Sequence, residues 1–398
     1  MSRLSNRIEN LAESATLAMA AKAREFKQRG IDVISLSLGE PDFKTPKHIQ
    51  EGAKQAIDEG KYFSYPPVNG YLDLREAISE KFEKENGLQY SPNQIVVSNG
   101  AKQSIANVMF ALLNPGDEVV VFSPFWVSYS AMIELAEGVP VYVKGTIEND
   151  FKATAAQLKE AITDKTKAVI FSSPCNPTGS VFTKDELIAI SEVVLSHDDI
   201  FVISDEIYEH INYTEAHCSI GSLPGMNERT ITVNGFAKGF AMTGWRVGYI
   251  GAPEWIAKGA NKMQGQVTSA NCGIAQRAAY TALTSDLGPT REMGEAYLKR
   301  RSLVYDLLND IPGLKINMPE GAFYFFPDVS SYFGKEFDGN KIENASDFCM
   351  YILENAHVSL VTGEAFGSPA CVRLSYAASE ENLIEAARRI KEALAKLK

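Results

Sequence analysis

The sequence predicts an α/β protein in which helices cover both faces of a mostly parallel sheet, with a smaller α+β domain beside it. From about residue 93 onward, short runs of β-branched residues alternate with helical segments, which is typical of a parallel sheet. The chain has 398 residues, enough for two or three domains. Its 45% hydrophobic and 22% charged residues are typical of a globular protein with a large core.

The first part of the chain predicts helices separated by loops. Segment 11–29 has no Gly or Pro and ends before a glycine, which predicts a helix with a glycine stop. A β-rich run over 31–38 follows, and Gly39 after it either lines a surface crevice or forms a plain turn. Further helices are expected over 48–60 and 72–85, separated by an aromatic loop.

The middle of the chain predicts the strands of the sheet, each followed by polar or small residues. The expected strands are 95–98, 118–122, 168–172, 200–204, 230–233 and 246–251, and the expected helices are 103–113, 126–136 and 184–195. Ligands of open α/β sheets bind at the carboxyl ends of the strands, so residues just after them are candidate site residues. These candidates are Gly100, Ala101, Lys102, Trp126, Asn176, Asp205, Tyr208 and Lys238.

The last part of the chain mixes helices and strands and predicts a second domain. A long helical region over 253–285 is interrupted near 269–273, and another helix is expected over 291–310. Shorter elements follow: strands at 323–326, 358–361 and 371–375, a helix at 345–355, and a final helix. We expect residues 1–45 to contribute to the small domain, 46–290 to form the large domain, and 291–398 to form the rest of the small domain.

Charge and cysteine content limit the functional classes. The formal net charge of −11 argues against binding to nucleic acid or anionic membranes and favours a small polar substrate. The five cysteines are scattered and show no CxxC spacing, so neither a disulfide framework nor a metal site is predicted. With no membrane-length apolar run and a poor match to a signal peptide, the protein is expected to be cytoplasmic, where thiols stay reduced.

One lysine and one arginine lie close together in the most unusual stretch of the sequence, 232–251. Lys238 follows a β-type run and is flanked by Gly235, Ala237 and Gly239, which allow a bulky partner to approach the backbone. A lysine whose pKa is lowered by burial can form a Schiff base with a carbonyl cofactor, and Arg246, eight positions later, can bind a phosphate. Taken alone, Lys238 would more often be a solvated surface residue.

Three other stretches of the sequence, taken together with this one, form a pattern that is typical of one enzyme family. The chain contains S-P-C-N-P-T-G at 173–179, S-D-E-I-Y at 204–208, K-G-F-A-M-T-G-W-R at 238–246 and C-V-R-L-S at 371–375. In this order the motifs closely resemble the aspartate aminotransferase family of class I pyridoxal-phosphate enzymes, in its prokaryotic aspartate/prephenate subgroup. The resemblance covers nearly the whole chain and implies the fold type I of these transferases and pyridoxal 5′-phosphate as cofactor.

The resemblance implies a role for each residue of the catalytic group. Lys238 holds the cofactor covalently and shuttles the substrate proton, and Asp205 keeps the pyridine nitrogen protonated, which suits a carboxylate that needs a cationic partner if it is buried. Tyr208 and Asn176 bind the phenolic oxygen of the cofactor. Without the family, a helix N-cap for Asp205, a core aromatic for Tyr208 and a turn residue for Asn176 remain open.

The remaining cofactor contacts are also implied by the resemblance. Trp126 stacks on the pyridine ring, although a core tryptophan is the alternative. The phosphate is held by the backbone at Gly100, Ala101 and Lys102, by Arg246, and by Tyr65 from a second subunit. This last role implies a homodimer with shared active sites.

For the substrate, the resemblance implies a site with two ends. Arg373 binds the α-carboxylate in a pocket lined by Gly39, Asn176 and Trp126, and Lys102, assisted by Thr16, takes the distal carboxylate. The animal-type enzymes have S-x-S before the lysine, whereas this chain has Gly235-Phe236-Ala237. Two hydroxyl partners of the phosphate are therefore missing, and the distal arginine of those enzymes has no clear counterpart here, with Arg277 as a candidate.

The expected activity is transamination of L-aspartate with 2-oxoglutarate to oxaloacetate and L-glutamate. Within the same class, the alternatives are an aminotransferase for prephenate or aromatic amino acids, or a β-lyase. From a different class, the alternative is a non-catalytic regulator that binds pyridoxal phosphate. Such regulators carry an added DNA-binding domain, and the sequence shows neither this domain nor a basic patch.

Overall fold

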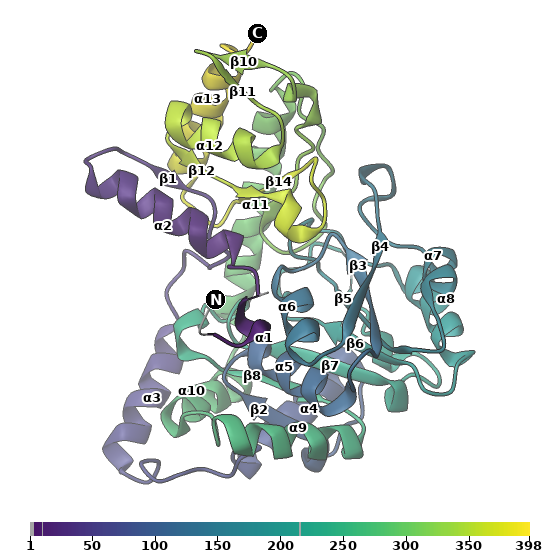
Figure 1. The fold of residues 1–398 in the computed structure, drawn as a ribbon. Coiled ribbons are helices and arrows are strands. Elements are labelled where there is room, and N and C mark those ends of the chain that lie inside the picture. Colours follow the sequence, from purple (N-terminus) through teal and green to yellow (C-terminus); the bar gives the residue numbers. More distant parts are fainter. Residues whose placement is uncertain (1–3, 10, 215) are drawn as a thin grey trace.

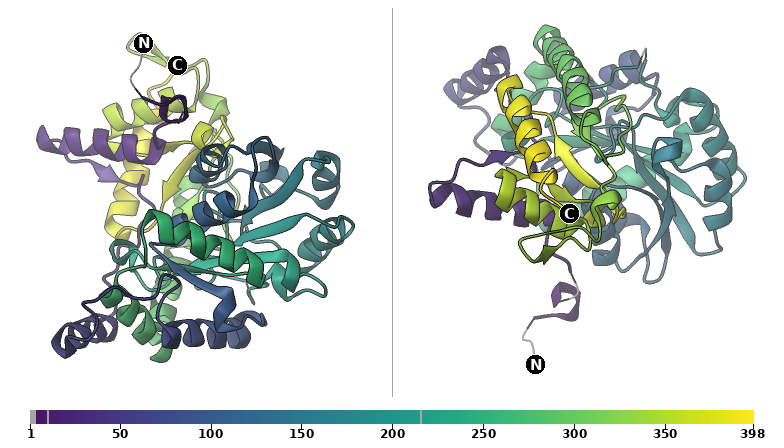
Figure 2. Two further views of the ribbon diagram at one scale, coloured as in Figure 1. Left: turned by 60° about the horizontal axis from the view of Figure 1, so that its bottom comes forward. Right: turned by 90° about the horizontal axis from the view of Figure 1, so that it is seen from above.

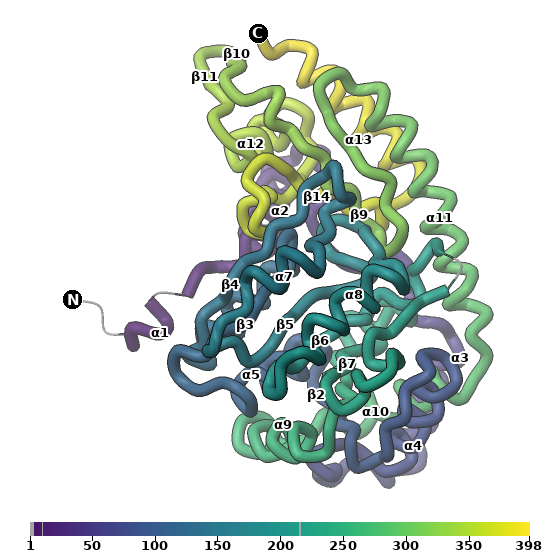
Figure 3. Tube along the Cα trace, turned by 90° about the vertical axis from the view of Figure 1, so that its right-hand side faces the viewer, coloured from purple at the N-terminus to yellow at the C-terminus, as the bar shows by residue number. Residues whose placement is uncertain are grey.

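The computed structural model describes residues 4–9, 11–214 and 216–398 and contains one large sheet region and one C-terminal region. Figure 1 shows the sheet region below and the C-terminal region above it. Helix α11 (Gly288–Asn309) runs from one region to the other and lies beside α13 (Glu380–Leu394), as the turned view of Figure 3 shows. The two regions meet where the strands of the large sheet end.

Seven strands form the large sheet in the order β2-β8-β7-β6-β5-β3-β4. Strands β3 to β7 pair in parallel, whereas β8 pairs antiparallel with both β2 and β7. The predicted α/β class with a mostly parallel sheet is therefore confirmed. The bounds are β2 Ile95–Ser98, β3 Glu118–Ser123, β4 Val139–Lys144, β5 Thr166–Ser172, β6 Phe201–Asp205, β7 Thr230–Gly235 and β8 Gly248–Gly251.

Alternate residues of each strand pack on opposite faces of the sheet, as the two-residue period of a strand requires. Val119 and Val121 face a cluster formed with α5, α6 and α9, whereas Val120 and Phe122 face a cluster formed with α7 and α8. Helices α3, α4 and α10 pack against β2 and β8 in a third cluster. The bounds are α3 Lys47–Glu59, α4 Leu72–Lys81, α5 Ala101–Leu112, α6 Ser128–Leu135, α7 Ala155–Ala161, α8 Lys184–Leu195, α9 Glu254–Val267 and α10 Gly273–Thr284.

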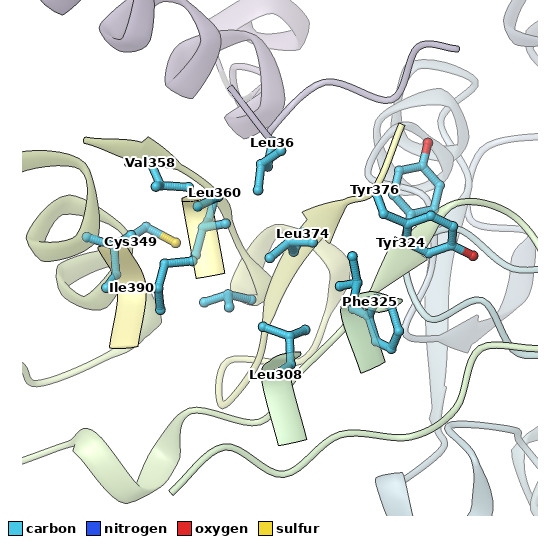
Figure 4. Packing of buried hydrophobic residues seen from close by; sticks show 14 of the residues in the cluster. Leu36, Leu308, Tyr324, Phe325, Cys349, Val358, Leu360, Leu374, Tyr376 and Ile390 are labelled. Carbon is cyan, nitrogen blue, oxygen red and sulfur yellow. The ribbon is translucent and has the colours of Figure 1, made fainter. Parts of the chain in front are cut away.

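The C-terminal region has its own buried cluster, to which the N-terminal segment contributes. Figure 4 shows Leu36 packed among Val358, Leu360 and Leu374. Strand β1 pairs in parallel with β12, and helix α2, purple in Figure 2, lies beside these yellow-green elements. The bounds are α2 Ala15–Gln28, β1 Ile34–Ser35, β9 Tyr324–Phe325, α12 Ala345–Ala356, β12 Val358–Ser359, β13 Val361–Thr362 and β14 Val372–Ser375. The residue limits of the two domains stay a prediction.

Some predicted elements differ from the structure. The helix expected over 11–29 begins at Ala15, and the strand expected over 31–38 is reduced to β1. Strand β4 was not predicted, because it is a largely exposed edge strand that contains Pro140, and proline weakens the strand signal. The strand expected to begin at Arg246 begins at Gly248, because Arg246 has a left-handed backbone with φ 55°.

Two further observations concern the chain as a whole. The five cysteines are free thiols. Among the described residues, no helix is both long enough and apolar enough to cross a membrane.

Candidate active site

A cavity of about 510 Å³ lies where the large sheet meets the C-terminal region. Its walls come from the ends of β5, β6 and β7, from the start of α5, from β14, and from the segments on either side of β1. The predicted site residues that line it are Thr16, Gly39, Ala101, Lys102, Trp126, Asn176, Asp205, Tyr208, Lys238, Arg246 and Arg373. Residues from distant parts of the chain thus share one cavity.

Lys238 lies three residues beyond the end of β7 and points at the N-terminal segment. Its Nζ donates a hydrogen bond to the backbone oxygen of Gly39. Burial, together with the nearby guanidinium of Arg373, lowers the pKa of the Lys238 ammonium to about 8. A substantial fraction of this amine is therefore neutral near physiological pH and can act as a nucleophile or a base.

Asp205 is the last residue of β6, and its carboxylate is buried with a relative exposure of 4%. The hydroxyl of Tyr129 donates to Asp205 Oδ2 at 2.6 Å, and the Ile207 backbone N–H donates to Oδ1 at 3.3 Å. Burial raises the pKa of Asp205 to about 6, although both hydrogen bonds act to lower it. The reading of Asp205 as a helix N-cap is wrong, since a strand ends there and no helix follows directly.

The sequence reasoning did not find Tyr129. This residue is fully buried on α6, three positions after Trp126. Its backbone N–H donates a hydrogen bond to the Trp126 carbonyl at 3.0 Å. The spacing of one helical turn was the only available signal, because Asp205 is 76 positions away in sequence. Trp126 itself lies just before α6 rather than in its first turn.

Arg373 occupies β14 and is buried at 2% exposure, so the reading as a surface arginine is wrong. Its Nη1 donates to Asn176 Oδ1 at 2.9 Å, and its Nη2 donates to the Ser37 backbone oxygen at 2.6 Å. The guanidinium carbon lies 4.6 Å from the centre of the Tyr324 ring. Its Nε is buried and has no hydrogen-bond partner among the described residues, which leaves one donor for a ligand.

Tyr208, a predicted site residue, forms a pair with Tyr324, which the sequence analysis did not identify. Their hydroxyl oxygens are 2.7 Å apart, and both side chains are buried. The Tyr324 hydroxyl would lie 2.5 Å from a Cβ added at Gly39, so only glycine allows this tyrosine to reach the cavity. Tyr208 therefore lies in the cavity wall as well as in the C-terminal core.

Arg246 reaches the N-terminus of α5. Its Nη2 donates to the Asn99 carbonyl at 3.2 Å, and its Nη1 donates to the Thr243 carbonyl at 3.0 Å. At Gly100, the N-cap of α5 with φ 83°, an added Cβ would lie 2.4 Å from Arg246 Nη2. A glycine is therefore needed there, and the guanidinium and the helix N-terminus together form a positive site of the kind that binds phosphate.

Lys102, in the first turn of α5, lies over the indole ring of Trp126. Its Nζ is 5.1 Å from the ring centroid. Burial lowers the pKa of Lys102, and the neighbouring Arg246 lowers it in the same direction. Lys102 and Thr16 both line the cavity.

Three predicted residues are absent from the lining of this cavity: Gly100, which adjoins it as the N-cap of α5, Tyr65 and Arg277. Tyr65 is 96% exposed and does not line it. Arg277 forms an ion pair with Asp73 and lies between the rings of Tyr62 and Tyr280, at 5.0 and 4.4 Å from their centroids. Within this chain Arg277 is therefore engaged elsewhere, and the structure does not bring it to the substrate end.

The chain belongs to the class I and II aminotransferases, whose family model matches residues 31–390. It is 47% identical to a bifunctional aspartate aminotransferase and glutamate/aspartate-prephenate aminotransferase of Petunia hybrida, over 99% of this chain and 83% of the relative. The crystal structure of the aspartate aminotransferase from Rhizobium meliloti superposes with a TM-score of 0.96 at 40% identity, over all of both chains. An aspartate aminotransferase from Thermus thermophilus solved with maleate gives 0.93 at 41% identity, over 99% of this chain and all of the other.

The protein is thus an aminotransferase of fold type I that uses pyridoxal 5′-phosphate and acts on small amino acids and 2-oxo acids. The predictions of an enzyme and of this cofactor are confirmed, and the alternative of a non-catalytic regulator is not supported. The residues present fit the cofactor. The Gly100 cradle would be filled by any Cβ, the buried Asp205 has a raised pKa that a neighbouring cation would lower, and the amine of Lys238 has a lowered pKa.

Proposed function

We propose that this aminotransferase converts L-aspartate and 2-oxoglutarate to oxaloacetate and L-glutamate. The observation that carries the proposal is one cavity in which Lys238 is accompanied by Arg246, assigned below to the phosphate, and by two further cations, Arg373 on β14 and Lys102 on α5. Two cations suit a substrate with two carboxylates. The Rhizobium and Thermus relatives are named aspartate aminotransferases, and the Thermus structure was solved with maleate, which supports the same substrate class.

We assign the cofactor contacts to residues in and beside the cavity. We assign the phosphate to the backbone of Gly100, Ala101 and Lys102 and to the Arg246 side chain, because the α5 N-terminus and the guanidinium meet there. Asp205 pairs with the ring nitrogen, Tyr208 and Asn176 with the phenolic oxygen, and Trp126 with the ring face. Lys238 provides the covalent attachment.

The catalytic work of the chain is divided among three residues. When bound, the cofactor supplies a carbonyl that condenses with amines and a ring that accepts the electron pair from the substrate α-carbon. The Lys238 amine, with its pKa near 8, would take the proton from that carbon as general base and, as general acid, would deliver it to the former carbonyl carbon of the cofactor. Asp205 holds its negative charge next to the ring nitrogen, and Tyr129 holds Asp205 in place.

Substrate orientation depends on the buried arginine. Arg373 presents its guanidinium beside Asn176, with Tyr324 and Phe366 packed on it at 4.6 and 4.9 Å. A buried, packed guanidinium binds a carboxylate in a single orientation. The α-carboxylate is therefore fixed at this end, and the side chain of the substrate points toward Lys102 and Thr16.

Lys102 is expected to select dicarboxylic substrates. Lys102→Met keeps the apolar stem but removes the charge, so KM for aspartate and 2-oxoglutarate should rise about 10- to 100-fold, as expected for one lost charged hydrogen bond. KM for phenylalanine should change less than about twofold. Single-turnover half-reactions with each substrate, followed by the visible absorbance of the bound cofactor, measure this. Equal effects on aspartate and phenylalanine would contradict a distal-carboxylate role.

A second candidate function is transamination of prephenate or aromatic substrates. It is favoured by the Petunia relative, whose name includes a prephenate activity. A steady-state panel with aspartate, prephenate, phenylalanine and cystathionine separates the two functions and the β-lyase alternative. Aspartate should give the highest kcat/KM.

We also propose a cytoplasmic homodimer in which Tyr65 completes the site of the partner. The support is the exposure of Tyr65, whose ring is 96% accessible in a loop of the sheet region. Tyr65→Phe should weaken binding of pyridoxal phosphate about fivefold, as for one hydrogen bond, while Phe63→Leu in the same loop should not. Sedimentation velocity should give a dimer, and a fully active monomer would exclude a shared site.

A further inference from the structure

The loop between Lys238 and Arg246 has a conformation that its own sequence does not favour. Ala241 and Arg246 have φ of 50° and 55°, in the left-handed region that L-residues with a Cβ rarely adopt. Between them a short 3-10 turn spans Thr243–Trp245. Such a loop needs contacts from elsewhere to persist.

A single hydroxyl outside this loop contacts it at two points. Thr45 Oγ1 donates to the Ala241 carbonyl at 2.7 Å and accepts from the Trp245 indole Nε1–H at 2.9 Å. These two loop residues bracket Thr243, whose carbonyl accepts from Arg246 Nη1 at 3.0 Å. The hydroxyl therefore acts on the same turn that orients the Arg246 guanidinium.

Thr45 is itself held firmly. It precedes Pro46, which restricts its backbone to extended conformations, and its carbonyl accepts from Gln50 Nε2 at 2.5 Å. Three residues earlier, Asp42 accepts from Arg300 Nη1 of α11 at 2.8 Å. The segment that carries Thr45 is thus anchored to α3 and α11, independently of the loop.

We propose that Thr45 is a positioning residue for the cofactor phosphate, acting through the turn that places Arg246. Lys238 lies close to the end of β7 and is positioned mainly by the sheet, whereas the Arg246 guanidinium is held by the Thr243 carbonyl of the turn and by the Asn99 carbonyl before α5. Asn271 Nδ2 donates to the Arg246 backbone carbonyl at 2.7 Å, so it holds the backbone of Arg246 rather than its guanidinium. This inference rests on the proposed phosphate role of Arg246.

The test compares cofactors with and without the phosphate on the full chain. Thr45→Val removes the hydroxyl at nearly constant volume, and Thr45→Ser keeps it. For Thr45→Val, the Kd of pyridoxal 5′-phosphate should rise about 5- to 30-fold, as for one or two lost hydrogen bonds, while the Kd of pyridoxal changes less than about twofold. Thr45→Ser should keep the phosphate preference, and Tm should fall by no more than a few degrees in either variant.

A second variant checks the route of the effect. Trp245→Phe removes the indole donor and, as a single substitution, should weaken binding of the phosphorylated cofactor. Added to Thr45→Val, it should cause no further loss of affinity, as expected for coupled residues. An equal loss of affinity for both cofactors would show a general structural role and overturn the proposal. Arg246→Ala in the same assay separates the two hypotheses. If it leaves the phosphate preference intact, the proposed phosphate role fails; if it abolishes the preference while Thr45→Val does not, only the inference about Thr45 fails.

Discussion

Replacement of Lys238 by alanine should lower kcat by about 10⁴-fold or more, because it removes the general base together with the covalent attachment. In the wild type, reduction with borohydride should fix the cofactor to the peptide that contains Lys238. In Lys238→Ala no reduced adduct should form, and mass spectrometry of the digested protein measures this. A reduced adduct at another lysine would contradict the assignment.

The pH dependence of the rate at which the cofactor attaches to Lys238 provides an independent test of this assignment. Because the pKa of Lys238 is lowered to about 8, the neutral amine becomes dominant above that pH. The rate at which the cofactor-free chain captures the cofactor should therefore rise with pH and level off above about 8, whereas an exposed lysine would continue to gain reactivity toward about 10. Lys258→Ala provides the matched control, since Lys258 is an exposed residue of α9 paired with Glu254. It should behave like the wild type.

Asp205→Asn should give the second largest effect. The amide keeps the shape of the carboxylate but cannot carry its charge, so kcat should fall about 10²- to 10³-fold, the usual effect of removing one preorganised electrostatic group. KM for aspartate should change little, because Arg373 and Lys102 are retained. Stopped-flow measurement of the first half-reaction separates the two parameters.

The control for this variant is Asp185→Asn, an exposed carboxylate in the first turn of α8. Its activity should equal that of the wild type. Asp205→Asn should also keep the wild-type Tm within a few degrees, since Tyr129 can still donate to the amide oxygen. A kcat within about tenfold of the wild type would argue against an ion pair with the ring nitrogen.

The fold class could be predicted because its signals are local. Runs of β-branched residues followed by helical segments define strands such as β5 and β6 without reference to the rest of the chain. Strand β4 was missed because an exposed edge strand with a proline lacks that local signal. The start of β8 was misplaced, because the left-handed conformation of Arg246 depends on contacts outside its own segment.

The sequence by itself determined the family, the cofactor and eleven of the residues that line the cavity, because four motifs of specific chemistry carry the resemblance that assigns them. Only the tertiary structure decided how these residues act on one another. Tyr129 meets Asp205 across 76 positions, Tyr208 meets Tyr324 across 116, and Thr45 meets the lysine loop across about 200. Such pairs leave no periodic trace in the sequence, since their contacts form only when the sheet brings the strand ends together.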